Sequence, residues 1–242
     1  MAVGSGRFGN LATLGLSLVA TALLAACSQV LTMGDGPVQS GADDLSLFSA
    51  EAVLQDRWQH LPLRGKTDYS LAVLDGRVAI RATGAAGASA LVRRVTIDPR
   101  KCPVVEWSWA VEQLQDDADI REKEKEDVAA SLYLLFGDPG LLIDPVPVPT
   151  LRYVWTNAAV SAGSVVDSPY LPGTVRSLVV ESGAARRGDW VTVRRNVLKD
   201  FERAFARPAD AQIHAVALFT DNDQTKQPVE AYYEWARMTC EE

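Results

Sequence analysis

Beyond residue 60, most of the chain alternates apolar and polar residues with a period of two. In one such run Val105, Trp107 and Trp109 share one side. Glu106 and Ser108 share the other side. This alternation predicts strands with one buried face, because successive side chains of a strand point to opposite sides. Strands of this kind need a second layer over their apolar faces, so the pattern predicts a mainly β fold.

Ten predicted strands share this pattern: 69–74, 77–82, 91–97, 105–111, 130–136, 151–156, 176–181, 190–194, 213–220 and 229–238. Between the first two, Asp75-Gly76 is typical of a tight hairpin turn, since both residues accept a positive φ. The strands do not alternate with long helices. The predicted architecture is therefore an antiparallel two-sheet β-sandwich.

Two short helices are predicted beside the strands. Asp43 or Asp44 can cap one that runs through residues 51–53, and Asn196 can cap another over 197–206. We expect the second helix to cover an open end or flank of the sandwich.

Two long connections are predicted to lie at the surface. The run 113–127 is dense in charges of both signs and is predicted to be a solvated loop or a frayed helical turn. The run 137–149 contains four prolines, which cannot donate to a strand ladder, so an extended connection is expected there.

The amino terminus has the pattern of a lipoprotein signal peptide. Arg7 precedes an apolar run, and Leu24-Ala25-Ala26-Cys27 completes a lipobox. A membrane span is the alternative, but the apolar stretch of about 16 residues is shorter than the roughly 20 that a spanning helix needs. Cys27 is therefore the predicted lipidation site. Ser28 is typical of sorting to the outer membrane, with the domain facing the periplasm.

Three segments are predicted: a signal peptide over 1–26, a flexible Gly-, Ser- and Pro-containing tether over 27–42, and a single domain over 43–242. The formal charge of the 242-residue chain is −7. Because no block of Lys or Arg offers a phosphate-binding face, a nucleic-acid partner is excluded. The membrane, reached through the lipid at Cys27, is the expected partner.

Two further cysteines remain in what would be an oxidising compartment. Cys102 precedes a predicted strand and Cys240 follows the last one. If those strands are antiparallel neighbours, the start of one lies beside the end of the other. We therefore predict a Cys102–Cys240 disulfide; two unrelated thiols are the alternative.

Catalytic signatures are scarce. The chain has two histidines, His60 and His214, in separate segments, which argues against a His-rich zinc site. Glycoside hydrolysis needs two carboxylates about 5–9 Å apart. Glu106 with Glu230 or Glu234 could supply them if their strands are neighbours, so an enzyme acting on polysaccharide stays an alternative.

Aromatic residues recur in pairs on the predicted strands: Trp107 with Trp109, Tyr153 with Trp155, and Tyr233 with Trp235. Each pair places two rings on one strand face. Such rings can serve as flat platforms for sugars, but the same spacing fills the space between two sheets, which is the favoured interpretation.

Hard oxygen ligands gather in the turn Asp221-Asn222-Asp223 before the last strand. Asp221 and Asp223 could help to bind calcium, which takes six to eight such ligands. A plain turn, in which Asp and Asn bind their own backbone, is the alternative.

Several runs together resemble the bacterial envelope family catalogued as domain of unknown function 3047. They are Glu126-Asp127-x-x-Ala130, Leu151-x-Tyr153-Val154-Trp155, Arg195-Asn196-Val197-x-x-Asp200-Phe201 and Phe219-Thr220-Asp221-Asn222-Asp223-x-Thr225. The similarity covers roughly 58–238. It implies a jelly-roll sandwich shaped like carbohydrate-binding modules or galactose-binding-like domains, with no catalytic set to carry over. One departure is Ser131, where members often have Arg.

These observations lead to a hypothesis of non-catalytic binding of a saccharide or another polar envelope ligand. The predicted ligand-binding residues are Glu126, Asp127, Asp221, Asn222 and Asp223, with Trp155 and Tyr232 as platform rings. The alternatives are a polysaccharide-acting enzyme and a structural or assembly lipoprotein.

Overall fold

The computed structural model describes residues 44–53, 58–141 and 144–240. Of two units that contacts define along the chain, the second, Pro37–Glu242, is compact and holds all described residues. Among those residues, none of the helices has the length and apolar character needed to span a membrane.

The predicted signal peptide (1–26), the lipidation site Cys27 and the tether (27–42) lie outside the described residues, as does Asp43.

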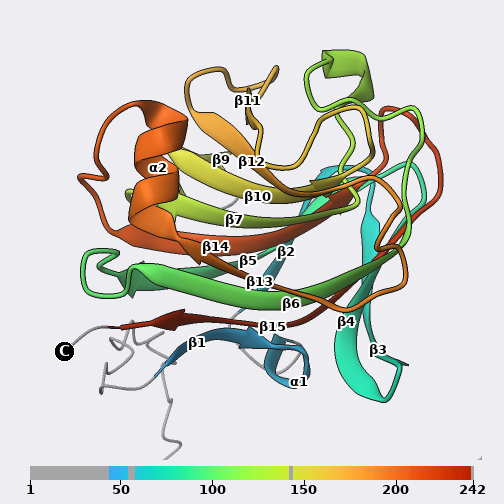
Figure 1. Cartoon of the computed structure of the whole chain (residues 1–242), viewed down its shortest axis with the longest axis horizontal. Helices are drawn as coiled ribbons and strands as arrows, with labels where there is room; N and C mark the ends of the chain where they lie inside the picture. Colours follow the sequence, from blue (N-terminus) through green and yellow to red (C-terminus); the bar gives the residue numbers. More distant parts are fainter. Residues whose placement is uncertain (1–43, 54–57, 142–143, 241–242) are drawn as a thin grey trace, which may run out of the picture. The chain divides into compact units, whose positions relative to one another are not determined.

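The two layers of the second unit are β-sheets, drawn one above the other in Figure 1. Sheet A follows the order β13 (Val191–Asn196), β6 (Val104–Gln113), β15 (Val229–Thr239), β4 (Arg77–Gly84) and β3 (Thr67–Leu74), with β1 (Leu45–Ser49) paired to the end of β15. Sheet B follows the order β11 (Val165–Asp167), β12 (Val175–Ser182), β10 (Thr150–Thr156), β7 (Ala130–Phe136), β14 (Ile213–Asp221), β5 (Ala88–Ile97) and β2 (Gln59–Arg64). The predicted two-sheet sandwich and its ten strands are confirmed.

One pair of strands departs from the predicted antiparallel arrangement. Strands β10 and β12 are parallel, so sheet B is mixed. The physical reason lies in the connection between them, which forms β11 and reverses before entering β12. Strand β12 pairs with β11 on one side and with β10 on the other.

Several short strands were not predicted. Strand β2 carries Pro62, which cannot donate to a ladder, and it lies at the edge of sheet B where this is tolerated. Strands β8 (Gly140–Leu141) and β9 (Asp144–Pro145) pair within the proline-rich connection, which corrects the prediction that this segment contains no strand.

Large aromatic side chains fill the space between the sheets. Trp107, Trp109, Tyr153, Trp155 and Tyr233 are each at most 1% exposed. The rings of Trp107 and Tyr153 lie 4.9 Å apart across the two sheets. The core interpretation of these five rings is therefore confirmed.

Trp235 does not share the face of Tyr233 as predicted. Tyr233 lies opposite Trp109, but Trp235 lies opposite Ser108, because the register shifts between them as at a β-bulge. The extra residue, Glu234, turns Trp235 to the outer face of sheet A.

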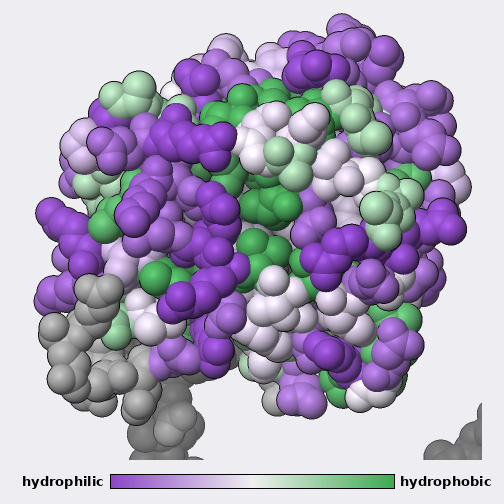
Figure 2. Space-filling view, in the orientation of Figure 1, coloured by the Kyte–Doolittle hydropathy of each residue, from purple (hydrophilic) through white to green (hydrophobic). Residues whose placement is uncertain are grey.

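Both predicted helices are present as α1 (Ala50–Val53) and α2 (Val197–Phe205). The Asn196 side chain accepts a hydrogen bond from the Lys199 N–H at 3.0 Å, as expected of an N-cap. Helix α2 contacts β10, β12 and β13, so it covers a flank shared by both sheets (Figure 1). In the same view, Figure 2 shows a strip of hydrophobic side chains beside it at the centre of the face, bordered by hydrophilic ones.

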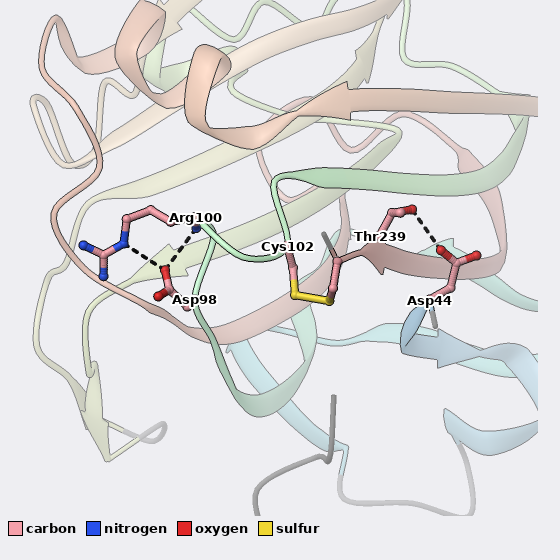
Figure 3. Close-up of a disulfide and its surroundings, with 6 residues drawn as sticks. Asp44, Asp98, Arg100, Cys102 and Thr239 are labelled. Atoms are coloured by element: carbon pink, nitrogen blue, oxygen red, sulfur yellow. Dashed lines mark hydrogen bonds and ion pairs between the residues drawn. A yellow bond between two sulfur atoms is a disulfide. The ribbon is translucent and has the colours of Figure 1, made fainter. Parts of the chain in front are cut away.

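The predicted disulfide is also present. Strands β6 and β15 are antiparallel neighbours, with Val104 opposite Thr239. Cys102 and Cys240 lie just beyond this pair and are bonded (Figure 3), although 138 positions separate them in the sequence.

We expect the Cys102–Cys240 bond to stabilise the domain by up to about 4–5 kcal/mol, because it closes a long loop in the unfolded chain. Cys102→Ser and Cys240→Ser should lower the free energy of unfolding equally in a denaturant titration, since each removes the same bond. Adding reductant to the wild type should reproduce the loss. Identical midpoints for oxidised and reduced wild type would contradict this prediction.

Candidate functional site

The predicted acidic residues converge where β14 ends at one side of sheet B. Glu126 and Asp127 come from the connection between β6 and β7. Asp221 is the last residue of β14, and Asn222 and Asp223 follow it. One carboxylate oxygen from each of Asp127, Asp221 and Asp223 lies within 4.8 Å of the other two. The fold thus brings together residues that are almost a hundred positions apart.

The connection that carries Glu126 is not the solvated loop that its charges predicted. Leu114, Ala118 and Ile120 are buried. Ile120 packs with Val154 and other valines on the outer face of sheet B. The charged side chains of the turn η1 (Lys123–Lys125) are exposed, as expected. The apolar residues hold this connection against the sheet and so fix Glu126 and Asp127 in place.

Two of the predicted ligand-binding residues hold loops together. Asp127 accepts hydrogen bonds from the backbone N–H of Gln224 (3.1 Å) and Thr225 (2.6 Å). Asn222 accepts from the Gly87 N–H at 3.0 Å and donates to the Gly84 carbonyl at 3.1 Å. Their polar atoms are occupied within the chain, so they position the site.

Glu126 is paired with a buried arginine. Arg152, on β10, is 3% exposed, and its guanidinium contacts Glu126 at 2.5 Å. It also donates to the Ser177 hydroxyl (2.7 Å) and the Tyr133 hydroxyl (3.1 Å). Burial lowers the pKa of Arg152, but Tyr133 and Glu126 raise it by more, so the guanidinium stays charged. Loss of one partner from such a buried pair typically costs about 3–5 kcal/mol.

Asp221 is buried without an arginine of its own. Its Oδ1 accepts from the Val128 N–H at 2.8 Å. Burial raises the pKa of Asp221 well above its ordinary value, and the carboxylates of Glu126 and Asp127 raise it further. Burial also raises the pKa of Asp223, although Arg64 at 3.3 Å opposes this shift.

A rim of less buried side chains borders these charges. Tyr170, 42% exposed, accepts a hydrogen bond from the Gln224 side chain at 2.7 Å and lies near Asp223 and Glu126. Tyr133 is half-buried, and its ring packs edge-on against Phe219 at 5.7 Å. We call this group the acidic site; its members are Glu126, Asp127, Tyr133, Arg152, Tyr170, Asp221, Asp223 and Arg64.

The two predicted platform rings lie elsewhere. Trp155 is fully buried, and its indole N–H donates to the Gly183 carbonyl at 3.2 Å, so it offers no face to a ligand. This corrects the prediction, since its strand face points between the sheets. Tyr232 lies on the outer face of sheet A, where its hydroxyl donates to Glu230 at 2.6 Å.

Glu106 and Glu230, one pair of the enzyme alternative, are not brought together. Glu106 lies opposite Arg237 on β15, seven positions from Glu230, which is about 20 Å along a strand. Glu106 is bound to Arg237, and Glu230 is bound to Arg81. Glu234 is bound to Arg77 at 3.0 Å, so each acid has a separate arginine partner.

Sequence reasoning missed Arg152, Tyr133 and Tyr170. A signal for Arg152 was present, because it is a charged residue in a strand that is otherwise apolar and buried. Ser131 stands where family members often have arginine, and its hydroxyl donates to the Phe219 carbonyl at 2.9 Å. The arginine that binds Glu126 is Arg152, which lies on β10 and not on β7, the strand of Ser131.

Oxygen ligands of the acidic site are compatible with a cation. Calcium bonds of about 2.3–2.6 Å would allow ligand oxygens up to about 5 Å apart. Asp127, Asp221 and Asp223 meet that spacing and could supply three of the six to eight ligands required.

A family model for proteins of unknown function, DUF3047, matches residues 56–236. The chain belongs to the DUF3047 family. The acidic site lies within the matched part of this DUF3047 domain, from Arg64 to Asp223. Among curated proteins, the comparison finds no match.

Solved structures similar to this DUF3047 domain include three β proteins of low identity. A low-affinity xylan-binding module, CBM86, from Roseburia intestinalis has a TM-score of 0.34 and 13% identity over 80% of this chain and 93% of that chain. A mannan-recognising module, TmCBM27, gives 0.35 and 10% over 83% and 97%. An adhesin domain of Lys-gingipain from Porphyromonas gingivalis gives 0.37 and 12% over 83% and 99%. At these scores the similarity bears on neither ligand nor activity.

The raised pKa of Asp221 predicts that this carboxyl group lowers the stability of the fold by an amount that depends on pH. An acid whose pKa is higher in the folded chain destabilises the fold as pH rises from about 4 towards that raised value. In EDTA, Asp221→Asn should therefore melt at least roughly 2–4 °C above wild type at pH 8, with a gain that shrinks towards pH 4. Asparagine keeps an oxygen for the Val128 N–H.

A wild type that melts at a higher temperature than Asp221→Asn in EDTA at pH 8 would contradict this account. Calcium chloride serves as the second arm of the same melting experiment. If the acids hold the ion, calcium should raise the midpoint of wild type and leave that of Asp221→Asn unchanged.

Proposed function

We propose that the domain binds a saccharide or another polar envelope component, without converting it, at the acidic site. The observation that carries this proposal is the buried Glu126–Arg152 pair, which lies beside the half-buried ring of Tyr133 and near the exposed ring of Tyr170. A fixed acceptor and a fixed donor beside aromatic rings is an arrangement suited to a ligand with many hydroxyl groups.

Preorganisation supports this proposal. Ser177 and Tyr133 hold the Arg152 guanidinium, and backbone N–H groups hold Asp127. Because these side chains are already fixed, a ligand would not have to order them on binding. Asp223, Arg64 and Tyr170 are the more accessible groups and would make the direct contacts.

Charge pairing supports binding over catalysis. A glycosidase needs one carboxyl group as acid and a second as base or nucleophile. In the acidic site Glu126 is bonded to Arg152, and both carboxylate oxygens of Asp127 already accept hydrogen bonds from the backbone of Gln224 and Thr225.

Binding can be tested with a thermal-shift screen of the full-length protein against cell-wall glycans and neutral oligosaccharides. Ligands of the folded state raise the melting midpoint by mass action. For a ligand that binds here, Tyr170→Ala and Asp223→Asn should each weaken affinity about tenfold or more, because they remove direct contacts.

The matched control is Asp210→Asn, which also removes an acid paired with an exposed arginine but lies after α2. It should bind as wild type does. Unchanged affinity in Tyr170→Ala and Asp223→Asn would show that the ligand binds elsewhere, and no shift with any glycan would sink the saccharide proposal.

We also propose that Cys27 carries the lipid that anchors the protein at the outer membrane. In cells fed radiolabelled palmitate, wild type should be labelled and recovered with outer membranes, whereas Cys27→Ser should remain unlabelled. An unlabelled wild type in the soluble fraction would exclude the anchor.

A further inference from the structure

Three aromatic side chains lie on the outer face of sheet A, away from the acidic site. Tyr232 lies opposite Ala110, and Trp235 lies opposite Ser108. Trp190 packs with Tyr232 and Ala110. The outward-facing residues between these rings, Ala110 and Ser108, are small. The rings therefore border a shallow surface formed by alanine and serine. We call this group the aromatic face.

Three arginine–carboxylate pairs border the aromatic face: Arg77–Glu234 (3.0 Å), Arg81–Glu230 (2.7 Å) and Arg237–Glu106 (2.6 Å). Arg77 also lies over the Trp190 ring, 5.3 Å from its centre, and Arg237 lies over the Trp235 ring at 5.1 Å. Arg237 also contacts Asp44 at 2.8 Å, so every charge in these pairs lies beside an opposite one. The face therefore offers donors and acceptors without selecting for a charged ligand.

Two buried polar atoms in this face have no hydrogen-bond partner among the described residues. They are the Ser108 hydroxyl oxygen and the Trp190 indole Nε1. Ser108 is fully buried, and its position on β6 points it to the outer face, between Thr192 and Trp235. Buried polar groups are normally paired, so these two indicate a partner that the chain itself does not supply.

We infer that the aromatic face is a second binding surface and takes a neutral oligosaccharide. The apolar faces of its sugar rings stack on Trp190 and Trp235, whereas Tyr232, which is 7% exposed, packs with Trp190 and supports it. Its hydroxyl groups meet the bordering arginines and carboxylates. Because Ser108 is fully buried, a neighbouring side chain must move aside before one of them reaches the Ser108 hydroxyl. Because this face lies on the other sheet, the inference stands independently of the proposed function of the acidic site.

Tryptophan fluorescence gives a test that needs no variant. Trp190, Trp235 and Trp58 are half-buried, whereas Trp107, Trp109 and Trp155 are buried. Acrylamide should therefore quench mainly the half-buried rings of the full-length protein. Cellohexaose or chitohexaose, both neutral, should protect Trp190 and Trp235 and leave Trp58 quenchable, and polygalacturonate, which is acidic, should protect none of them.

Variants then locate the bound sugar. By calorimetry, Trp235→Ala and Trp190→Ala should each bind the protecting hexaose at least tenfold more weakly, whereas Asp210→Asn, which lies in neither site, should stay within twofold of wild type. Near-UV circular dichroism checks that each variant is folded; if neither is, the quenching result decides. Full affinity in both tryptophan variants, or no protection by either neutral hexaose, would overturn the inference.

Discussion

The packing of β6 against β10 is the contact on which the rest of the structure depends. Trp107 meets Tyr153 at 4.9 Å, and Trp109 meets Trp155 at 6.4 Å. Because these rings fill the space between the two sheets, every second residue on the same strands must point outward. Arg152 is placed on the outer face of sheet B by this rule, between the inward-facing Leu151 and Tyr153. The acidic site and the aromatic face are therefore consequences of the same core.

A second constraint joins segments that are distant in the sequence. The Asp127 carboxylate accepts hydrogen bonds from the backbone N–H and the hydroxyl of Thr225, at 2.6 and 2.5 Å. Asp221 accepts from Val128 at the other side of the same junction. Two runs that carry the family resemblance thus bind one another. A third run follows the same logic, because Arg195 binds Asp200 and so fixes the start of α2. Much of what marks the family therefore holds loops in position.

Local patterns were enough to predict the elements of the fold but not their irregularities. The Asp75-Gly76 turn has positive φ at both residues, and Asn196 caps α2, because both features depend on a few adjacent residues. Trp235 was misplaced because a bulge shifts the register by one residue, which alternation alone cannot reveal. The acids of the candidate site were recognisable as a group. Their partners Arg152 and Tyr170 were not, since both lie close to Glu126 only through long-range pairing of strands and loops.

The two outer faces differ in how their charges are compensated, and that difference bears on what each can bind. In the acidic site Asp221 lies beside Glu126 and Asp127, and the buried guanidinium of Arg152 is bonded to Glu126. Negative charge there exceeds its nearby compensation, which favours a cation or a ligand rich in donors. On the aromatic face each carboxylate has its own arginine at hydrogen-bond distance. A ligand there would be selected by ring stacking and shape, because added charge on it would gain attraction from one member of each pair and repulsion from the other.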